Sequence, residues 1–586
     1  MRRNFHNISH PRVLLIGSCL SENLLLRIRA WFKKAGQDQV CLHHLLVNHL
    51  SALPEEPEAP IGSYDFQIIQ PPLRGVFHES HYLGVDFNNP DALKSLEDGA
   101  STHLSLFLDN YLGYHTKYGL TAFVTGFIIP QQNPLGRMMP RHSLSNLQHL
   151  VRRLNEQIEE ICLSRTNVHY VDLDEIASLI GKRHILDDAL HALSHGSIAG
   201  DFDFEHDRRR IQPPRKPYSK IRELKTGEFL DAVWEDILAR YQILTRHDPV
   251  KIVIVDLDDT LWRGVLAEDG IHPHGLEGWP LGVVEALQFL KKRGILLAIA
   301  SKNDESLIRE KWQEIFQGRL QLEDFASVRI NWNPKTESIR EILEETNLLP
   351  GNALFIDDNP VERDAVRREF PEIRILGEDL YGIREYLLTA PELDVPSITE
   401  ESAKRTEMIQ AQTQREGARQ SMSRVEFLQS LNLKVVGHII KIPSDQSFER
   451  ACELLNKTNQ FNTTGRRWTP EEICRFFAEG GVFHAFKVTD RFTAYGLVGL
   501  LLVQGNCIRQ FVMSCRVVGL DVEQQMLRAV IDKIDVPEVT AEYEKTEKNH
   551  LCADLYLKNG FDLQDESGLW VHAKPKKRIF LHKLFG

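Results

Sequence analysis

Two aspartates and a threonine follow a short apolar run near the middle of the chain, and their spacing suits phosphoryl chemistry. The run 251–255 ends at Asp256, and Asp258 and Thr260 follow at intervals of two residues. In an extended chain, side chains two positions apart lie on the same side. A carboxylate can attack phosphorus to form an aspartyl-phosphate, and a second carboxyl group can carry the proton of the leaving group. We therefore predict that Asp256 is a nucleophile or metal ligand and that Asp258 is the acid/base catalyst.

Other side chains suited to holding a phosphoryl group come later in the chain. Ser301 directly follows the apolar run 295–300, and its hydroxyl can hydrogen-bond a phosphoryl oxygen. Lys335 can neutralise the charge of the same group. The predicted substrate-binding residues of this region are Thr260, Ser301, Lys302, Asn303 and Lys335.

A phosphoryl site of this kind needs a divalent cation, because carboxylates and phosphate repel one another. Carboxylate oxygens are common ligands of Mg²⁺. A further apolar run, 353–356, is followed by Asp357, and we predict a Mg²⁺ site formed by Asp256, Asp258 and Asp357. Only 45 residues separate Asp256 from Ser301, which is too few for a large inserted cap domain. We therefore expect a site open enough to admit another macromolecule.

The order of these groups resembles the haloacid dehalogenase superfamily of phosphohydrolases, in which a D-x-D-x-T motif precedes a serine, a lysine and an acidic pair. The surrounding sequence resembles FkbH-like proteins more specifically. The matching segments are Asp256 to Gly270, Ser301 to Asn303, Phe355 to Arg363, Lys457 to Arg467, Asp490 to Phe492, Met513 to Gly519 and Tyr543 to Asn549. This resemblance implies capture of a glyceryl unit from 1,3-bisphosphoglycerate, loss of phosphate, and delivery of glycerate as a thioester to the phosphopantetheine arm of an acyl carrier protein.

The implied reaction gives a role to one of the eight cysteines. An acyl group destined for a phosphopantetheine thiol can pause on a cysteine, because thioester exchange is nearly balanced and a thiolate is a strong nucleophile. Cys515 follows the apolar run 508–513 and precedes Arg516 and a predicted helix, and both a strand end and a helix N-terminus favour the thiolate. We predict that Cys515 is catalytic, whereas Cys507 and Cys552 are small buried residues.

The last third of the chain also resembles N-acetyltransferases that use acyl-CoA, whose pyrophosphate loop has the pattern Q/R-x-x-G-x-G/A. The corresponding segment here runs from Arg516 through Gly519 to Asp521, where an acidic residue replaces a small one. This difference favours a carrier-protein arm, with its one phosphate, over CoA. Polar residues nearby could hold substrate hydroxyls or a phosphate, or form an ordinary solvated surface. The predicted substrate-binding residues of this region are Asn459, Asn462, Arg466 and Arg516.

The first block of the chain contains a serine and a histidine in an order typical of esterases. Ser18 follows the first apolar run, and Asp188 and His191 come near the end of the block. This order resembles SGNH-type esterases, in which a serine nucleophile and a histidine base meet. No clear Gly-x-Asn oxyanion motif accompanies them, and Ser18 also suits a helix cap. We favour a scaffold or carrier-docking role for this block.

Alternation of apolar runs and helical periodicity indicates how these residues are positioned. In the first two blocks, strand-like runs alternate with helical stretches, which is typical of α/β domains with parallel sheets and places ligands at the carboxyl ends of strands. The last block mixes helices and strands as an α+β domain does. The predicted boundaries are 1–240 for an SGNH-like α/β domain, 246–395 for a doubly wound haloacid dehalogenase-like α/β domain, 396–430 for a helical connector and 431–586 for an acetyltransferase-like α+β domain.

The composition indicates a multidomain globular protein. The chain has 586 residues and a formal net charge of −12, with no long basic stripe of the kind that binds nucleic acid. Its longest apolar run, 497–503, is too short to cross a membrane, and neither a signal peptide nor a C-x-x-C pair is evident. We expect a cytoplasmic enzyme. The alternatives are a stand-alone phosphatase of small molecules and a non-catalytic scaffold that recruits carrier proteins.

Overall fold

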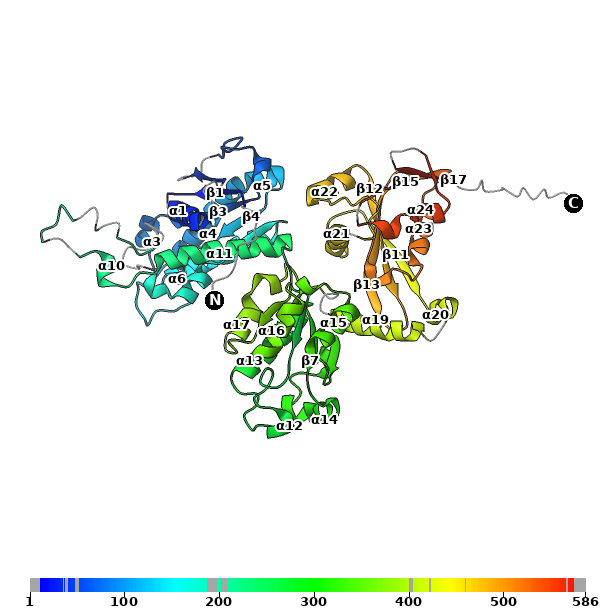
Figure 1. Ribbon diagram of the computed structural model, residues 1–586. Coiled ribbons are helices and arrows are strands. Elements are labelled where there is room, and N and C mark those ends of the chain that lie inside the picture. Colours follow the sequence, from blue (N-terminus) through cyan, green and yellow to red (C-terminus); the bar gives the residue numbers. More distant parts are fainter. Residues whose placement is uncertain are drawn as a thin grey trace. The chain divides into compact units, whose positions relative to one another are not determined.

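Figure 1 presents the computed structural model of the chain, which divides into two compact units, Met1–Thr245 and Arg246–Gly586. The residues that the structure describes are 11–19, 21–34, 36, 41–47, 52–186, 198–201, 204, 208–213, 216–399, 404–420, 423–458, 460–546, 548–564 and 568–573. Among these residues, no helix is both long and apolar enough to span a lipid bilayer.

The first unit is built on a five-stranded parallel sheet with strand order β2-β1-β3-β4-β5. Its strands are β1 (Val13–Gly17), β2 (Leu42–Leu46), β3 (Phe66–Gln70), β4 (Ala122–Thr125) and β5 (Val168–Val171). Its helices are α1 (Ser21–Lys34), α2 (Leu73–Val76), α3 (Glu79–Gly84), α4 (Pro90–Tyr111), α5 (Gly113–Tyr118), α6 (Leu147–Leu163), α7 (Leu173–Ile180), α10 (Tyr218–Ile221) and α11 (Thr226–Thr245).

Helices cover both faces of this sheet. On β1, Leu14 and Ile16 belong to the core that includes α4 and α6, whereas Val13 and Leu15 belong to the core that includes α1 and α11. A strand buried on both faces has to be apolar at every position, as β1 is. The expected α/β domain with a parallel sheet is therefore confirmed for this unit.

The second unit contains two sheets, and the first of them carries the predicted phosphoryl site. It is parallel, with strand order β10-β9-β6-β7-β8, so β6 lies between β9 and β7. Its strands are β6 (Ile252–Val255), β7 (Leu296–Ser301), β8 (Ser327–Ile330), β9 (Ala353–Ile356) and β10 (Arg374–Leu376). The helices of this region are α12 (Leu266–Asp269), α13 (Trp279–Lys292), α14 (Glu305–Phe316), α15 (Lys335–Thr346), α16 (Pro360–Glu369) and α17 (Ile383–Thr389). All five strands end at one edge, where a doubly wound domain places its ligands.

The predicted connector consists of two helices, α19 (Arg405–Gln420) and α20 (Arg424–Ser430). The first turns of α19 contact the middle sheet region: Arg405 donates to the Gly294 carbonyl at 3.1 Å, and Gln410 donates to the Phe325 carbonyl at 2.9 Å. Further along the helix, the buried side chain of Arg415 forms an ion pair with Asp490 at 3.2 Å. Helix α19 is therefore an integral part of this unit.

The second sheet of the unit has seven strands in the order β11-β12-β13-β14-β15-β17-β16, and it is antiparallel except between β14 and β15. Its strands are β11 (Lys434–Ile440), β12 (Gly481–Thr489), β13 (Ala494–Gln504), β14 (Cys507–Met513), β15 (Glu538–Glu542), β16 (Asp562–Leu563) and β17 (Leu569–Ala573). Its helices are α21 (Phe448–Lys457), α22 (Pro470–Ala478), α23 (Val522–Lys533) and α24 (Leu555–Lys558). The α21–α22 core and the α23–α24 core each take residues from the central strands β12, β13 and β14.

Candidate functional site

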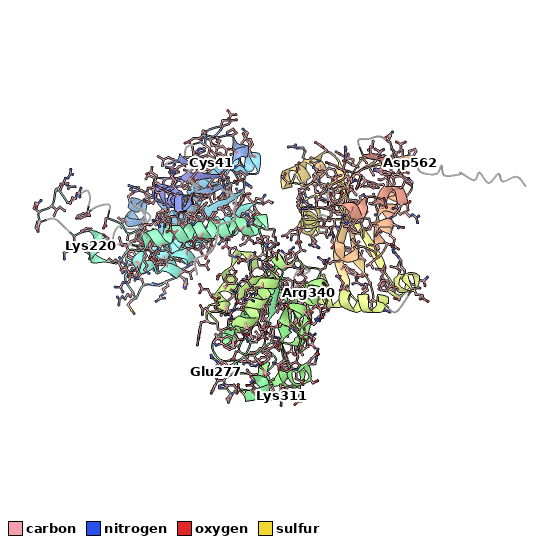
Figure 2. All side chains as sticks on the ribbon, viewed as in Figure 1. Cys41, Lys220, Glu277, Lys311, Arg340 and Asp562 are labelled. Atoms are coloured by element: carbon pink, nitrogen blue, oxygen red, sulfur yellow. The ribbon has the colours of Figure 1, made fainter. Side chains whose placement is uncertain are left out.

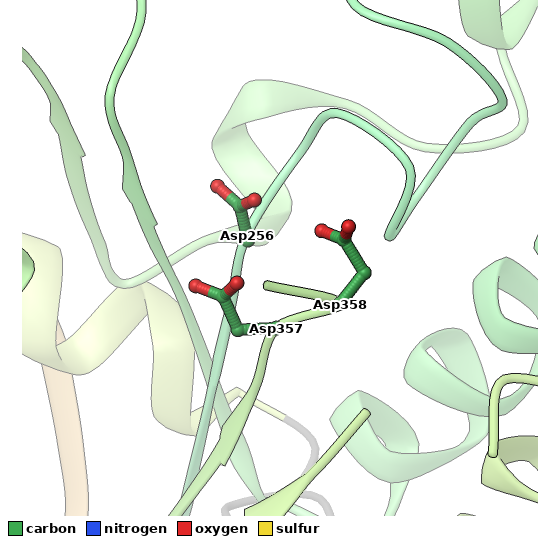
Figure 3. A group of neighbouring side chains, drawn as sticks. All are labelled: Asp256, Asp357 and Asp358. Carbon is green, nitrogen blue, oxygen red and sulfur yellow. The ribbon is translucent and has the colours of Figure 1, made fainter. Parts of the chain in front are cut away.

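Three aspartates meet at the carboxyl edge of the middle sheet (Figure 3). Asp256 directly follows β6, and Asp357 and Asp358 follow the neighbouring strand β9. The parallel register pairs Val255 with Ile356, so the next residues of both strands, Asp256 and Asp357, lie side by side. One carboxylate oxygen from each of the three aspartates lies within 4.8 Å of the others, and Asp256 and Asp357 are 6% and 0% exposed.

Lys335 compensates much of this buried negative charge. It is the first residue of α15, and its Nζ lies 2.9 Å from Asp256 Oδ1 and 2.6 Å from Asp357 Oδ2. Burial alone would lower the pKa of Lys335, but the two carboxylates outweigh burial and raise it, so the side chain is an ammonium ion. The structure places Lys335 beside Asp256 and Asp357, and its role in holding a phosphoryl group stays a prediction. Lys335 contacts Asp256, the predicted nucleophile, and Asp357, a predicted metal ligand, so a phosphoryl group bound at Asp256 would lie next to it.

The three-carboxylate group fits Mg²⁺ in its chemistry. Oxygen donors of this kind suit a hard divalent cation, whereas nitrogen or sulfur donors suit transition metals and zinc. Burial, followed by repulsion from Asp256, raises the pKa of Asp357 to about 6, and the same two causes raise the pKa of Asp358. A bound cation would favour the carboxylate forms and so lower these pKa values.

Asp258 lies differently from its predicted position, because its side chain is outside the three-carboxylate group and Asp358 completes that group instead. The chain leaves the extended conformation after β6 and turns at Asp259, whose φ of 49° is left-handed, so the alternation assumed from the sequence does not continue. The Asp258 carboxylate accepts hydrogen bonds from Trp262 Nε1 at 3.0 Å, from Asn303 Nδ2 at 2.7 Å and from the Leu266 amide at 3.1 Å.

These contacts leave Asp258 suited to acid/base work. Burial is the largest of the effects that raise its pKa, while the hydrogen bonds from Leu266, Asn303 and Trp262 oppose the shift. A carboxyl group with a raised pKa can hold a proton and deliver it to a leaving group. The three donors fix the carboxylate in one orientation next to the strand that carries Asp256.

The remaining predicted residues of this region occupy defined places. Ser301 is the buried last residue of β7, next to β6. Thr260 accepts a hydrogen bond from the Asp358 amide at 3.2 Å and donates to Asp358 Oδ1 at 3.3 Å, so it holds the metal-binding loop. Asn303 supports Asp258, as described, and Lys302 forms an ion pair with Glu362.

A buried arginine that sequence reasoning missed holds the backbone of the aspartate pair. Arg363 Nη1 donates to the carbonyls of Asp357 and Asp358 at 2.8 and 2.5 Å. Gly377 lies against the Asp357 carbonyl and has a φ of +127°. A Cβ at this position would come within 1.8 Å of the Asp357 carbonyl oxygen. Arg363 ends one of the segments that resemble FkbH-like proteins, but its spacing from Asp357 gives no sign of this role.

We expect Mg²⁺ to stabilise the protein more at a pH above the Asp357 pKa than below it. In the metal-free protein, the raised pKa of Asp357 means that the protonated form favours folding, and this contribution is lost as pH rises from the ordinary value of 3.8 through about 6. Mg²⁺ binds the carboxylate form and therefore competes with the proton. Thermal unfolding with and without Mg²⁺, measured about one pH unit on each side of that pKa, tests this. Equal Mg²⁺-induced shifts in Tm at both values would contradict it.

The predicted acyl-transfer residues that the structure describes lie in the connections between strands and helices of the second sheet region. Cys515 begins the one-turn helix η6 (Cys515–Val517), between β14 and α23, as the sequence predicts; its side chain lies outside the described part of the structure. Arg516 contacts the sulfur of Met408 on α19. Asn459 lies outside the described residues. Arg466 is exposed, pairs with Glu472 at 2.9 Å and stacks on a tryptophan ring.

Asn462 does not support its predicted role as a substrate ligand. Its side chain is fully buried, donates to the Thr458 carbonyl, and accepts hydrogen bonds from Gln510 Nε2 at 2.7 Å and the Gly465 amide at 2.9 Å. These bonds use the amide to close the loop that follows α21. The role of Asn462 is therefore structural.

The segment that resembles a pyrophosphate loop is built differently from such a loop. Leu520 is buried in the core beneath α23. Asp521 precedes the helix with a left-handed φ of 58°, and its carboxylate forms an ion pair with Arg424 of α20 at 2.7 Å. A carboxylate at the start of the helix repels a diphosphate, which agrees with the expectation that the CoA pyrophosphate binds poorly here.

Ser18 lies at the carboxyl edge of the first sheet, directly after β1, and is buried. Its backbone carbonyl accepts a hydrogen bond from the Ser21 amide at 3.0 Å, at the start of α1. Asp188 and His191 lie outside the described residues.

We expect Ser18→Ala to leave carrier loading largely unchanged, because the sequence around Ser18 lacks a full oxyanion motif. The measurement is glyceryl-carrier formation by intact-mass spectrometry, with circular dichroism as the control for folding. A loss of more than about tenfold in a folded variant, equivalent to roughly 1.4 kcal/mol of transition-state stabilisation, would show that Ser18 takes part in the chemistry.

Comparison with known proteins gives matches among solved structures alone. No family model and no curated protein sequence matches the chain. The N-terminal part of protein BF1531 from Bacteroides fragilis, which contains a phosphatase domain complexed with Mg, is 21% identical over 66% of this chain and 94% of its own, with a TM-score of 0.48. The 3-deoxy-D-manno-octulosonate 8-phosphate phosphatase of Moraxella catarrhalis, solved with magnesium, phosphate and KDO, is 17% identical over 25% of this chain and 91% of its own, with a TM-score of 0.18.

A third solved structure is an acyltransferase. The salicylyl-acyltransferase SsfX3 from a tetracycline biosynthetic pathway is 12% identical over 41% of this chain and 56% of its own, with a TM-score of 0.20. The first two structures are phosphatases solved with magnesium. All three TM-scores are below 0.5, so the interpretation of the site depends on its own residues.

Proposed function

We propose that the middle sheet of the second unit carries a Mg²⁺-dependent phosphatase whose nucleophile is Asp256. The observation that carries this proposal is the convergence of Asp256, Asp357 and Asp358 with Lys335 at the end of β6. Mg²⁺ bound by the three carboxylates would offset the repulsion between the nucleophile and a phosphate group. Ser301, at the end of the next strand, is available to donate to a phosphoryl oxygen.

The residues support a two-step displacement. An Asp256 oxygen attacks phosphorus and the bond from phosphorus to the ester oxygen breaks, while Asp258 gives its proton to that oxygen. Water then attacks the aspartyl-phosphate, the phosphorus–Asp256 bond breaks, and Asp258 takes a proton from the water. The products are an alcohol and inorganic phosphate, and both carboxyl groups return to their starting states.

We further propose that the substrate carries a glyceryl unit that ends on an acyl carrier protein, as the resemblance to FkbH-like proteins implies. The phosphatase site would first remove the ester phosphate of 1,3-bisphosphoglycerate, whose acyl phosphate is still in place. The Cys515 thiolate would then attack C1, and the carbon–oxygen bond to the acyl phosphate would break with release of the other phosphate. The phosphopantetheine thiolate would then take the acyl group from Cys515. The position of Cys515 at a strand end followed by helical turns supports this role.

The test is to measure phosphate and acyl-carrier product together. The full chain is incubated with 1,3-bisphosphoglycerate, Mg²⁺ and a phosphopantetheine-bearing carrier protein. Two phosphates per glyceryl unit loaded, and no release of the ester phosphate when a chelator removes Mg²⁺, are the expected results. Phosphate release with no acyl mass on either protein would reduce the function to a stand-alone phosphatase. Carrier binding with neither product would favour the scaffold.

A further inference from the structure

An ion pair lies at the carboxyl edge of the middle sheet, the edge that also carries Asp256. Lys302 directly follows β7 and Glu362 lies in the first turn of α16, directly after the β9 loop. Their side chains meet at 2.6 Å between Lys302 Nζ and Glu362 Oε1. Because β6 lies between β7 and β9, the pair joins the segments that follow the two strands on either side of β6, at the sheet edge where Asp256 lies.

Lys302 differs from the other cations of this edge in having a partner that a substrate can replace. In the described loops 256–263, 301–305 and 357–363, the other cations are Arg263 and Arg363. Arg263 donates to the Glu277 carbonyl and stacks on the Trp279 ring. Arg363 is buried and bonded to backbone carbonyls, as described above.

A substrate with a second negative group needs a cation other than Lys335 to bind that group. Lys335 is already shared between Asp256 and Asp357, and its side chain is only 5% exposed. Lys302 is 38% exposed, so its ammonium group can reach solvent and a ligand, whereas Glu362 is 15% exposed and stays in place. An anion that binds Lys302 has to compete with the Glu362 carboxylate for it.

We propose that Lys302 determines the substrate class of the phosphatase site: it binds a second anionic group of the substrate, and Glu362 holds Lys302 in place until that group displaces it. The inference rests on the proposed phosphatase function. It names the substrates as small phosphate esters that carry a carboxylate or a second phosphate a few bonds from the reacting phosphorus. Phosphate esters without such a group leave the Lys302–Glu362 ion pair intact, and Lys302 does not strengthen their binding.

The direction in which two substitutions change activity distinguishes this binding role from a structural role. Lys302→Gln removes the anion-binding group, whereas Glu362→Gln removes its competitor and frees Lys302 for the substrate. A salt bridge that only braces the loops would be lost equally in both variants, and both would then change activity in the same direction. The double variant is expected to behave as Lys302→Gln does, because no competitor matters once the cation is gone.

Two substrates that differ by one group provide the assay. 3-Phosphoglycerate and glycerol 3-phosphate share a carbon skeleton, but only the first has a carboxylate. For phosphate release by the full chain in Mg²⁺, kcat/KM is expected to be about tenfold higher for 3-phosphoglycerate than for glycerol 3-phosphate. Lys302→Gln is expected to lower this ratio by at least about fivefold, mainly by raising KM for 3-phosphoglycerate. Glu362→Gln is expected to lower KM for 3-phosphoglycerate by about threefold. The matched control is Arg340→Gln, which breaks an exposed ion pair between α15 and Glu369 of α16, the helix that also carries Glu362 (Arg340 is labelled in Figure 2).

A binding measurement keeps this test separate from that of the proposed function. Calorimetric titration of Mg²⁺-loaded Asp256→Asn with 3-phosphoglycerate needs no turnover. In this background, Lys302→Gln is expected to weaken the binding of 3-phosphoglycerate, and Glu362→Gln is expected to tighten it. Equal preference for the two esters, or shifts of the same sign in both variants, would overturn the inference and leave the phosphatase standing. Failure of the wild-type chain to release phosphate from either ester, with the expected pattern in the titration, would instead overturn the proposed function alone.

Discussion

Asp256→Asn is expected to abolish phosphate release while leaving the fold intact. The amide lacks the charge and nucleophilicity needed to form the aspartyl-phosphate, so the rate should fall on the order of a thousandfold or more. Lys335 keeps its second partner, Asp357, at 2.6 Å. Loss of one carboxylate from a repulsive group removes an unfavourable charge interaction, so the metal-free variant should unfold at a temperature no lower than the wild type.

The matched control for this substitution is Asp259→Asn. Asp259 lies in the same loop but outside the three-carboxylate group, and its carboxylate accepts a hydrogen bond from the Gly264 amide, which an asparagine oxygen can also accept. Asparagine tolerates the left-handed φ of 49° at this position. The control therefore removes one negative charge with little other change. Undiminished phosphate release by a folded Asp256→Asn variant would exclude Asp256 as the nucleophile.

Cys515→Ala is expected to abolish carrier loading. If Cys515 carries the acyl group, substrate without carrier protein should add one acyl mass to the wild-type enzyme, and hydroxylamine should remove that mass. The variant should show no adduct, and its carrier loading should fall by at least about a hundredfold. Phosphate release from a phosphate ester should continue, because Asp256 and its partners belong to a different sheet.

The control for Cys515→Ala is Cys507→Ala on β14. Burial raises the pKa of the Cys507 thiol, which makes it a poor nucleophile. Replacement of Cys507 should leave the acyl adduct unchanged. An adduct that persists in Cys515→Ala, or normal carrier loading by that variant, would remove this thiol from the mechanism.

The parts of the fold that were predictable from sequence are those buried on both sides. Strands β6, β7 and β9 are continuous apolar runs, and each is followed by a residue with chemistry: Asp256 after β6, Ser301 at the end of β7, and Asp357 after β9. The edge strands β8 and β10 were not predicted, because short and partly polar segments such as Arg374–Leu376 show no clear hydrophobic periodicity.

The errors at the site arise where the chain leaves regular structure. The choice of Asp258 over Asp358 as a metal-binding side chain assumed that the extended conformation continues past β6, whereas a left-handed residue at Asp259 turns the loop. The bond from Trp262 to Asp258 depends on that turn, and the bonds from Arg363 depend on α16 lying beneath the β9 loop. Contacts of this kind come from tertiary packing and have no signature in the spacing of residues.

Helix α19 limits how this protein can be recombined with another chain. Its Ile409 packs on the core of the middle sheet, while its Arg415 forms a buried ion pair with Asp490 in the loop between β12 and β13. A hybrid joined after the connector, near residue 430, would give Asp490 a foreign helix, and removal of one partner of a buried ion pair costs about 3–5 kcal/mol. A hybrid joined before Arg405 would keep that pair and lose the milder contacts to the middle sheet. Exchange of the seven-stranded sheet region with that of another protein should therefore succeed with the helix kept on the C-terminal side of the junction.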